Sequence, residues 1–195
     1  MIRGIVLAAG LGRRIGTPKA LLTLDGRTFL ERAVGALSGA GLEVVVVMNP
    51  GVSEASATAG FRGHRVVNPD PDQENGMFGS VRLGVSEALR LGASGALLLP
   101  VDLPLITIED VKAVVTSLGA GAAVVVATHG GRRGHPIGIS RAVMSEIVTD
   151  PSAGTLRDIV RRDPVRVVEV AVSLGAVMGV NTKEDLERVS NRTFR

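Results

Sequence analysis

The sequence predicts an α/β protein with a mainly parallel central sheet. Apolar runs that suit buried strands alternate along the chain with segments of helical periodicity, and this alternation is typical of βαβ units. The runs at 2–8, 43–48 and 95–99 are almost wholly apolar, as strands covered on both faces are. The 195 residues show no internal repeat, low-complexity tract or linker, so we expect one domain.

The remaining elements follow from the same patterns. We expect further strands at 65–67, 122–127, 136–139 and 165–170, and helices at 28–37, 53–58, 77–91, 107–118, 140–148, 154–161 and 182–190. Thr28 with Glu31, and Thr107 with Asp110, predict capped helix starts. The domain is expected to span 1–190, with a frayed tail over 191–195.

Composition excludes several kinds of protein and site. Without cysteine there are no disulfides, thiolate zinc sites or cysteine nucleophiles, which fits the reducing cytoplasm, where we expect the protein. No apolar run approaches the roughly 18 residues of a membrane span, and the one at the start is too short for a signal peptide. A net charge of +3 with only four aromatic residues does not suit a nucleic-acid surface, and a small anionic ligand explains the cation clusters better.

A glycine-rich loop, LAAGLGRRIGTPKALL, begins at the end of the first strand. Its glycines let the backbone turn and expose N–H groups, and Arg14 and Lys19 add positive charge, so the loop is suited to bind phosphates. Its G-x-G-x-x-x-G spacing is one residue longer than the dinucleotide fingerprint, and it lacks the Gly-Lys-Ser/Thr ending of a P-loop. We therefore predict a nucleoside triphosphate site of another kind.

Two polar residues further along the chain are candidate metal ligands. Asp102 follows a buried strand, where open α/β sheets bind their ligands, and its carboxylate could hold Mg²⁺ shared with the phosphates. The alternative is an ordinary turn or cap aspartate. Asn181 precedes a helix, so its side chain either caps that helix or gives a metal its amide oxygen.

Five motifs stand in order along the chain: L-A-A-G-x-G-x-R-x-G-x-x-K from Leu7 to Lys19, GMFGSVRLG at 76–84, PVDLP at 100–104, GHPI at 134–137 and GVNTKEDL at 179–186. In this order they resemble the MobA-like nucleotidyltransferases, and most nearly the molybdenum cofactor cytidylyltransferases. The resemblance implies a single-domain, three-layer GT-A (Rossmann-like) fold. It implies that CMP passes from CTP, with Mg²⁺ or alternatively Mn²⁺, to the terminal phosphate of molybdenum-bound molybdopterin, with release of pyrophosphate.

The same resemblance assigns roles to single residues. Three are expected to be catalytic: Lys19 at the α-phosphate, Arg14 at the departing pyrophosphate and Asp102 at the metal. The expected nucleotide contacts are Leu7, Ala8, Ala9, Gly10, Gly12, Arg14, Lys19, Asn75, Ser80 and Asp102. Asn181 is the second expected metal ligand, although many relatives carry aspartate at position 179 or 181, where this chain has Gly179 and Asn181.

A second cationic stretch is expected to bind the second substrate. Arg132, Arg133 and His135 lie in a predicted loop over 129–135 whose glycines permit close approach to a phosphate and a pterin. Arg157 is a weaker candidate, and a solvated hairpin tip is the alternative interpretation. A terminal phosphate is largely ionised at neutral pH, so the expected reaction needs no general base.

Three alternatives stay open. The first is another nucleotidyltransferase of the same fold, either one that uses GTP in place of CTP or one that acts on another small molecule, although Ala9 and Pro18 favour the cytidylyl branch. A GT-A glycosyltransferase would show an Asp-x-Asp motif, whereas Asp102 is followed two residues later by Pro104. The third alternative is a non-catalytic protein that delivers nucleotide or cofactor. We expect a monomer or weak dimer that touches a recipient molybdoenzyme transiently and binds neither nucleic acid nor membrane.

Overall fold

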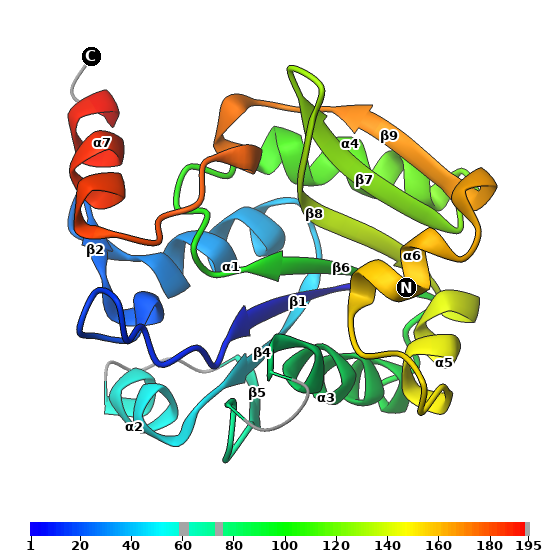
Figure 1. Cartoon of the computed structure of the whole chain (residues 1–195), viewed down its shortest axis with the longest axis horizontal. Helices are drawn as coiled ribbons and strands as arrows, with labels where there is room; N and C mark the ends of the chain where they lie inside the picture. Colours follow the sequence, from blue (N-terminus) through cyan, green and yellow to red (C-terminus); the bar gives the residue numbers. More distant parts are fainter. Residues whose placement is uncertain (59–62, 73–75, 194–195) are drawn as a thin grey trace.

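A seven-stranded sheet forms the centre of the computed structural model, which describes residues 1–58, 63–72 and 76–193 (Figure 1). The strand order is β5-β4-β1-β6-β8-β7-β9. These strands are β1 (Ile2–Ala8), β4 (Glu43–Met48), β5 (His64–Val67), β6 (Gly95–Pro100), β7 (Val124–His129), β8 (Arg132–Ser140) and β9 (Val167–Ala171). Only β8 runs antiparallel to its neighbours within this sheet, so the predicted mainly parallel sheet is confirmed.

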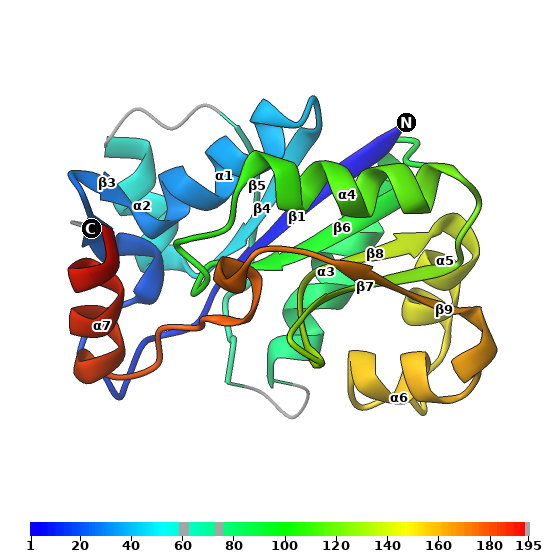
Figure 2. The same ribbon diagram turned by 90° about the horizontal axis from the view of Figure 1, so that it is seen from above.

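Helices cover both faces of the sheet, as Figures 1 and 2 show. The helices are α1 (Phe29–Gly39), α2 (Pro50–Thr58), α3 (Gly76–Arg90), α4 (Ile108–Gly119), α5 (Arg141–Thr149), α6 (Leu156–Arg161) and α7 (Lys183–Thr193). Three 3₁₀ turns, η1 (Lys19–Leu21), η2 (Pro164–Arg166) and η3 (Leu174–Val177), and a small hairpin of β2 (Thr23–Leu24) and β3 (Arg27–Thr28) complete the described part. No helix within it is long and apolar enough to cross a bilayer.

The alternation of side chains along the strands creates two cores. Val6 on β1 packs with α1 and α4, whereas its neighbour Ile5 packs with α3 and α5 on the other face. Leu97 and Leu98 on β6 divide in the same way. Burial on both faces explains why these strands are apolar without interruption, and it confirms the three-layer arrangement.

Both predicted capping boxes are confirmed, whereas α2 begins at Pro50, three residues before its predicted start, and α6 at Leu156, two residues after it. Thr28 and Glu31 form a complete capping box at α1, and Thr107 and Asp110 form another at α4. At the other end of the chain, α7 continues to Thr193, so residues 191–193 are helical where the sequence predicts fraying, and 194–195 lie outside the described residues.

The connection between β7 and β8 differs from the prediction. The sequence predicts a loop over 129–135, but the two strands are paired up to His129 and Arg132. Only Gly130 and Gly131 form the turn, with φ of 55° and 76°. Two successive residues with positive φ are what a tight hairpin turn requires, and glycine adopts them without steric cost, so the strands extend further than their polar residues indicate.

Candidate active site

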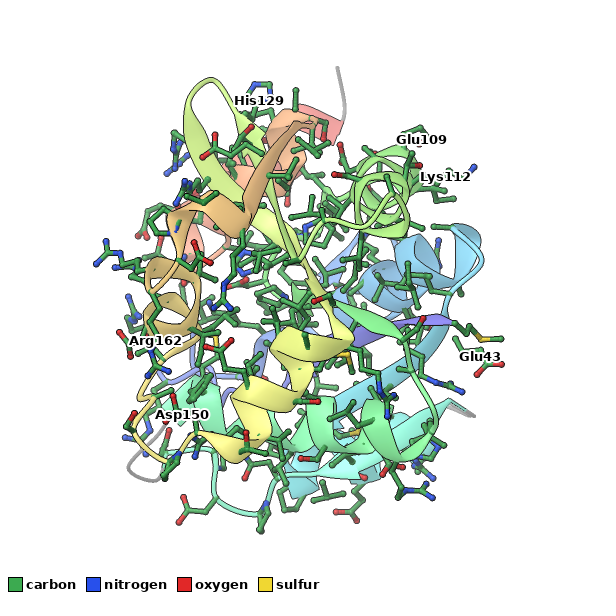
Figure 3. The ribbon with its side chains drawn as sticks, turned by 90° about the vertical axis from the view of Figure 1, so that its right-hand side faces the viewer. Glu43, Glu109, Lys112, His129, Asp150 and Arg162 are labelled. Carbon is green, nitrogen blue, oxygen red and sulfur yellow. The ribbon has the colours of Figure 1, made fainter. Side chains whose placement is uncertain are left out.

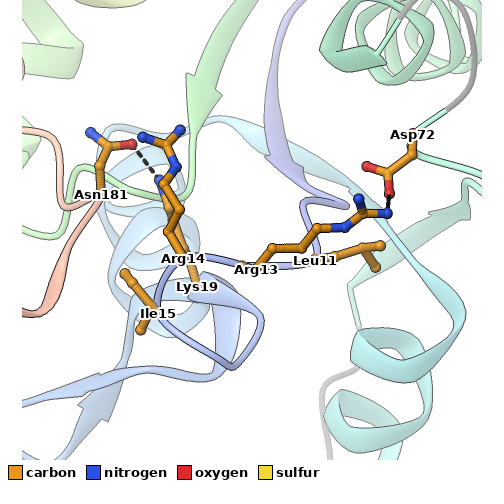
Figure 4. Close-up of a pocket in the computed structure, with 8 residues that line it drawn as sticks. Leu11, Arg13, Arg14, Ile15, Lys19, Asp72 and Asn181 are labelled. Atoms are coloured by element: carbon orange, nitrogen blue, oxygen red, sulfur yellow. Dashed lines mark hydrogen bonds and ion pairs between the residues drawn. The ribbon is translucent and has the colours of Figure 1, made fainter.

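Two adjoining cavities lie at the carboxyl ends of β1 and β6. The larger, about 340 Å³, lies between the glycine-rich loop, the residues that follow β6 and the first turns of α3. The smaller, about 270 Å³, lies between the same loop and Asn181 (Figure 4). Gly12, Lys19 and Asp72 line both cavities, so together they form one cleft where open α/β sheets bind ligands.

Lys19 joins the two candidate metal ligands at the centre of this cleft. Its Nζ lies 2.9 Å from Oδ2 of Asp102. The same Nζ lies 2.7 Å from Oδ1 of Asn181, the contact that Figure 4 shows. The Lys19 and Asp102 side chains are each about one-fifth exposed, so the ion pair is partly shielded from water and yet reachable. The fold thus brings together three predicted site residues that stand 83 and 162 positions apart along the chain.

The segment before α7 is fixed to the end of β6 by its backbone. Val180 donates its N–H to the carbonyl oxygen of Asp102 at 2.9 Å. The residue that caps α7 is Thr182, whose hydroxyl accepts the N–H of Asp185 at 3.2 Å, while the carboxylate of Asp185 accepts the N–H groups of Asn181 and Thr182. The Asn181 side chain is therefore free of that task, and its amide oxygen turns toward Lys19.

The buried side chain of Asn49 is hydrogen-bonded to the backbone of the glycine-rich loop. Its Nδ2 donates to the carbonyl oxygen of Ala9 at 3.0 Å, and its Oδ1 accepts the N–H of Val52 at 2.9 Å. The residue is only 3% exposed. The dipeptide Asn49-Pro50 is typical of a turn, but α2 already begins at Pro50, and the partner of Asn49 lies 40 positions earlier, just after β1.

The loop itself closes on Gly12. The carbonyl oxygen of Gly12 accepts the N–H groups of Ile15 and Gly16, both at 2.9 Å. The φ of Gly12 is +65°, and a Cβ at this position would lie 1.8 Å from the carbonyl oxygen of Thr17. This glycine is thus required both by its backbone conformation and by the lack of space.

The two arginines of the loop lie differently. Arg14 is exposed and lines the smaller cavity together with Lys19 and Asn181 (Figure 4), where it could meet the outer phosphates of a bound triphosphate. Arg13 forms an ion pair with Asp72 across the mouth of the cleft. No motif in the sequence points to a role for Asp72.

The predicted nucleotide contacts surround the larger cavity. Its lining includes Leu7, Ala9, Gly10, Gly12, Lys19, Ser80 and Asp102. The Ala8 side chain instead packs into the core beneath the loop. Ser80 is buried near the start of α3, and Asn75 lies outside the described residues.

His135, one of the residues expected to bind the second substrate, lies close enough to Asp102 for the carboxylate to affect its titration. Burial lowers the pKa of His135 to about 4, and the negative charge of Asp102 opposes this shift. The imidazole is therefore neutral at pH 7. Gly134 was expected to admit a ligand, but a Cβ there would lie 2.1 Å from the carbonyl oxygen of Ala176, so the lack of a side chain serves the packing of η3.

The three arginines of that group lie further out. Arg132 is exposed next to the β7–β8 turn, at the same edge of the sheet as the cleft. Arg133 forms an ion pair of 2.7 Å with Glu169 on β9. Arg157 is exposed on α6, which precedes the start of β9, and it lines neither cavity.

The MobA-like NTP transferase domain family matches residues 4–167, which is most of the chain. The chain belongs to this family. The MobA-like protein is accordingly an enzyme, a nucleotidyltransferase, and the family resemblance seen in the motifs is confirmed.

The GT-A-type fold is confirmed as well by two solved structures. Rv0371c from Mycobacterium tuberculosis has a TM-score of 0.83, 26% identity and 98% coverage of both chains. A nucleotidyl transferase from Methanothermobacter has a TM-score of 0.82, 24% identity, and coverage of 100% and 98%.

Three relatives share different lengths of the MobA-like chain. A molybdenum cofactor guanylyltransferase from Acidiphilium cryptum is 29% identical over 191 residues, covering 95% of this chain and 92% of its own. A nicotine blue oxidoreductase from Paenarthrobacter nicotinovorans is 32% identical, covering 78% and 79%. A CMP-5'-(3-aminopropyl)phosphonate synthase from Streptomyces rubellomurinus is 41% identical over an alignment of 93 residues that covers 42% of this chain and 15% of that protein.

Proposed function

We propose that this enzyme transfers CMP from CTP to the terminal phosphate of molybdenum-bound molybdopterin, forming molybdopterin cytosine dinucleotide and pyrophosphate. The observation that carries the proposal is the Lys19 ammonium held between Asp102 and Asn181 in a cleft lined by the glycine-rich loop. A relative named as a molybdenum cofactor guanylyltransferase covers almost the whole chain, which supports this class of acceptor.

The reaction needs positioning and charge neutralisation more than proton transfer. The ionised terminal phosphate of the acceptor attacks the α-phosphorus of CTP in line, and the bond to the β-phosphate oxygen breaks. We assign Lys19 to stabilise charge at the α-phosphate and Arg14, which lines the smaller cavity, to meet the pyrophosphate as it departs. The neutral His135 beside Asp102 is suited to contact the acceptor rather than to neutralise its phosphate.

Asp102 and Asn181 fit a divalent cation. Their oxygens lie 2.9 Å and 2.7 Å from one ammonium nitrogen, so two hard donors converge on a point where a positive charge is already stabilised. Mg²⁺ commonly uses one or two carboxylates together with substrate phosphates, and when bound it would neutralise the triphosphate. Mn²⁺ is the alternative, and a structure of the mycobacterial relative, 25% identical, is a complex with manganese.

The choice of CTP rests on the loop and on one relative. Ala9 and Pro18 are the residues that resemble the cytidylyl branch. The relative named as a CMP-phosphonate synthase shares 41% identity over 93 residues. Guanylyltransferases are also among the relatives, so GTP is the alternative that an experiment must test.

Initial rates of pyrophosphate release with purified molybdopterin and either CTP or GTP test the proposal. We expect a clear preference for CTP. Replacing Lys19 with alanine should lower the rate by about 10² to 10³, because it removes a charge aimed at the reacting phosphate. Lys112→Ala on the outer face of α4 is the matched control and should leave the rate unchanged (Figure 3). A preference for GTP contradicts the cytidylyl assignment, and full activity of Lys19→Ala contradicts the assigned site.

A further inference from the structure

Asn68 directly follows β5, and its side chain contacts Ser80, which lines the larger cavity. It is 6% exposed, and its backbone N–H donates to the carbonyl oxygen of Met48 at 2.8 Å. Its side chain lies between two groups: Oδ1 accepts the backbone N–H of Asp70 at 3.1 Å, and Nδ2 donates to Oγ of Ser80 at 3.0 Å. The mechanism proposed above assigns no role to this residue.

The Asp70 contact fixes which way the Asn68 amide faces. A backbone N–H can only donate, so the atom opposite it must be the amide oxygen. The NH₂ group therefore faces Ser80, and the Ser80 hydroxyl acts as an acceptor in that bond. A hydroxyl has one proton, and in the described part of the chain no acceptor receives the proton of Ser80.

Ser80 lines the larger cavity although it is only 3% exposed. A bound molecule with a hydrogen-bond acceptor can therefore accept the hydroxyl proton of Ser80. A molecule without an acceptor at this point would bind more weakly, because it would leave the buried hydroxyl without a partner. With Asn68 in place, the serine presents a donor to the ligand and cannot easily turn to present a lone pair.

We propose that Asn68 is a positioning residue that holds the Ser80 hydroxyl as a hydrogen-bond donor toward the nucleobase. This inference rests on the proposed function, in which the larger cavity takes the nucleoside of a triphosphate. On its Watson–Crick edge cytosine presents two neighbouring acceptors, O2 and N3, whereas guanine presents there the N1–H and N2–H₂ donors beside one acceptor, O6. A fixed donor at Ser80 thus favours cytosine.

Asn68→Asp tests the direction of this hydrogen bond. The new carboxylate keeps an acceptor for the Asp70 N–H but replaces the donor that faces Ser80, so the serine proton turns away from the cavity. We expect about tenfold weaker CTP binding, measured by calorimetry, since one hydrogen bond to the base is lost. Binding of inorganic tripolyphosphate, which has no base, should change less than about twofold.

A double-mutant cycle separates positioning from a general structural effect. If Asn68 acts through the serine, Asn68→Asp should weaken CTP binding no further once Ser80→Ala is present. Asn68→Ala, which buries no charge, is the second variant and should also weaken CTP more than tripolyphosphate. Ser56→Ala removes another buried serine, whose hydroxyl contacts Ser53 and Met48 and which does not line the cavity, and it should bind CTP as the wild type does.

The outcomes distinguish the two proposals. The inference is overturned if Asn68→Asp binds CTP like the wild type, if CTP and tripolyphosphate weaken equally, or if the effects of the two substitutions simply add. A wild type that binds neither CTP nor GTP more tightly than tripolyphosphate overturns the proposed function. A wild type that prefers GTP overturns the choice of cytosine in both proposals, and the cycle measured with GTP then decides whether Asn68 acts through Ser80.

Discussion

Gly12→Ala should damage the active site more than it damages the fold. At Gly12 the φ is +65°, and a new Cβ would lie 1.8 Å from the Thr17 carbonyl oxygen, so the two segments must separate by roughly 1.2 Å to reach even a tight contact of 3.0 Å. That movement displaces the loop that lines the cleft, and a misplacement of about 1 Å can cost about 10² in rate. We expect kcat/KM for pyrophosphate release to fall by about 10² or more.

Gly16→Ala is the matched control for this substitution. Gly16 also has a positive φ, +89°, but a Cβ there would meet no atom within 4 Å. It should therefore show only the strain of a left-handed residue, about 1–2 kcal/mol, which lowers the Tm by a few degrees. Circular dichroism melts and steady-state rates of both variants separate strain from overlap. Equal rates for the Gly12 and Gly16 variants would refute the idea that contact with Thr17 sets the loop.

Three further predictions concern the metal site, the pH dependence of stability and the packing of η3. Asp102→Asn should weaken Mn²⁺ binding in the presence of nucleotide at least about tenfold, measured by calorimetry, because it removes the carboxylate from the pair of oxygens around Lys19; unchanged binding would place the metal elsewhere. Burial alone would raise the pKa of Asp110, but hydrogen bonds from Ser173 and Thr107 outweigh it and lower that pKa, so its contribution to stability is present above about pH 4 and is lost as the pH falls through the lowered value. The difference in Tm between wild type and Asp110→Asn should accordingly shrink below pH 4, and a difference that stays constant would contradict this. Gly134→Ala should lower the Tm by several degrees, since a Cβ would lie 2.1 Å from a backbone oxygen of η3; an unchanged melt would show that η3 can move away.

The sequence predicts the strands and most helices of this protein because its apolar runs are buried on both faces. Lys19, Asp102 and Asn181 could be predicted as site residues from their motifs, but their mutual contact depends on segments up to 162 positions apart. Asn49 and Asn68 are each followed by proline, which is typical of a turn, and nothing nearby in the sequence indicates partners on other elements.

The same limit applies to the second substrate. Charged residues and glycines at 129–135 are typical of a loop, yet the backbone pairing of β7 with β8 continues through most of them. Strand pairing is a property of two segments together, so composition alone placed the loop ends wrongly. The packing of Gly134 against η3 also could not be predicted, because η3 lies some forty positions further along the chain.

The bond from Val180 to Asp102 has a consequence for how the enzyme matures during synthesis. All seven strands of the large sheet have emerged by Ala171, so the sheet can form before the last part of the chain is made. Until residues 180 and 181 arrive, Lys19 and Asp102 can meet only each other, and the amide oxygen that completes their cluster is missing. A chain cut before residue 180 should therefore keep its sheet and lose its activity, which makes the segment before α7 the step that completes the enzyme.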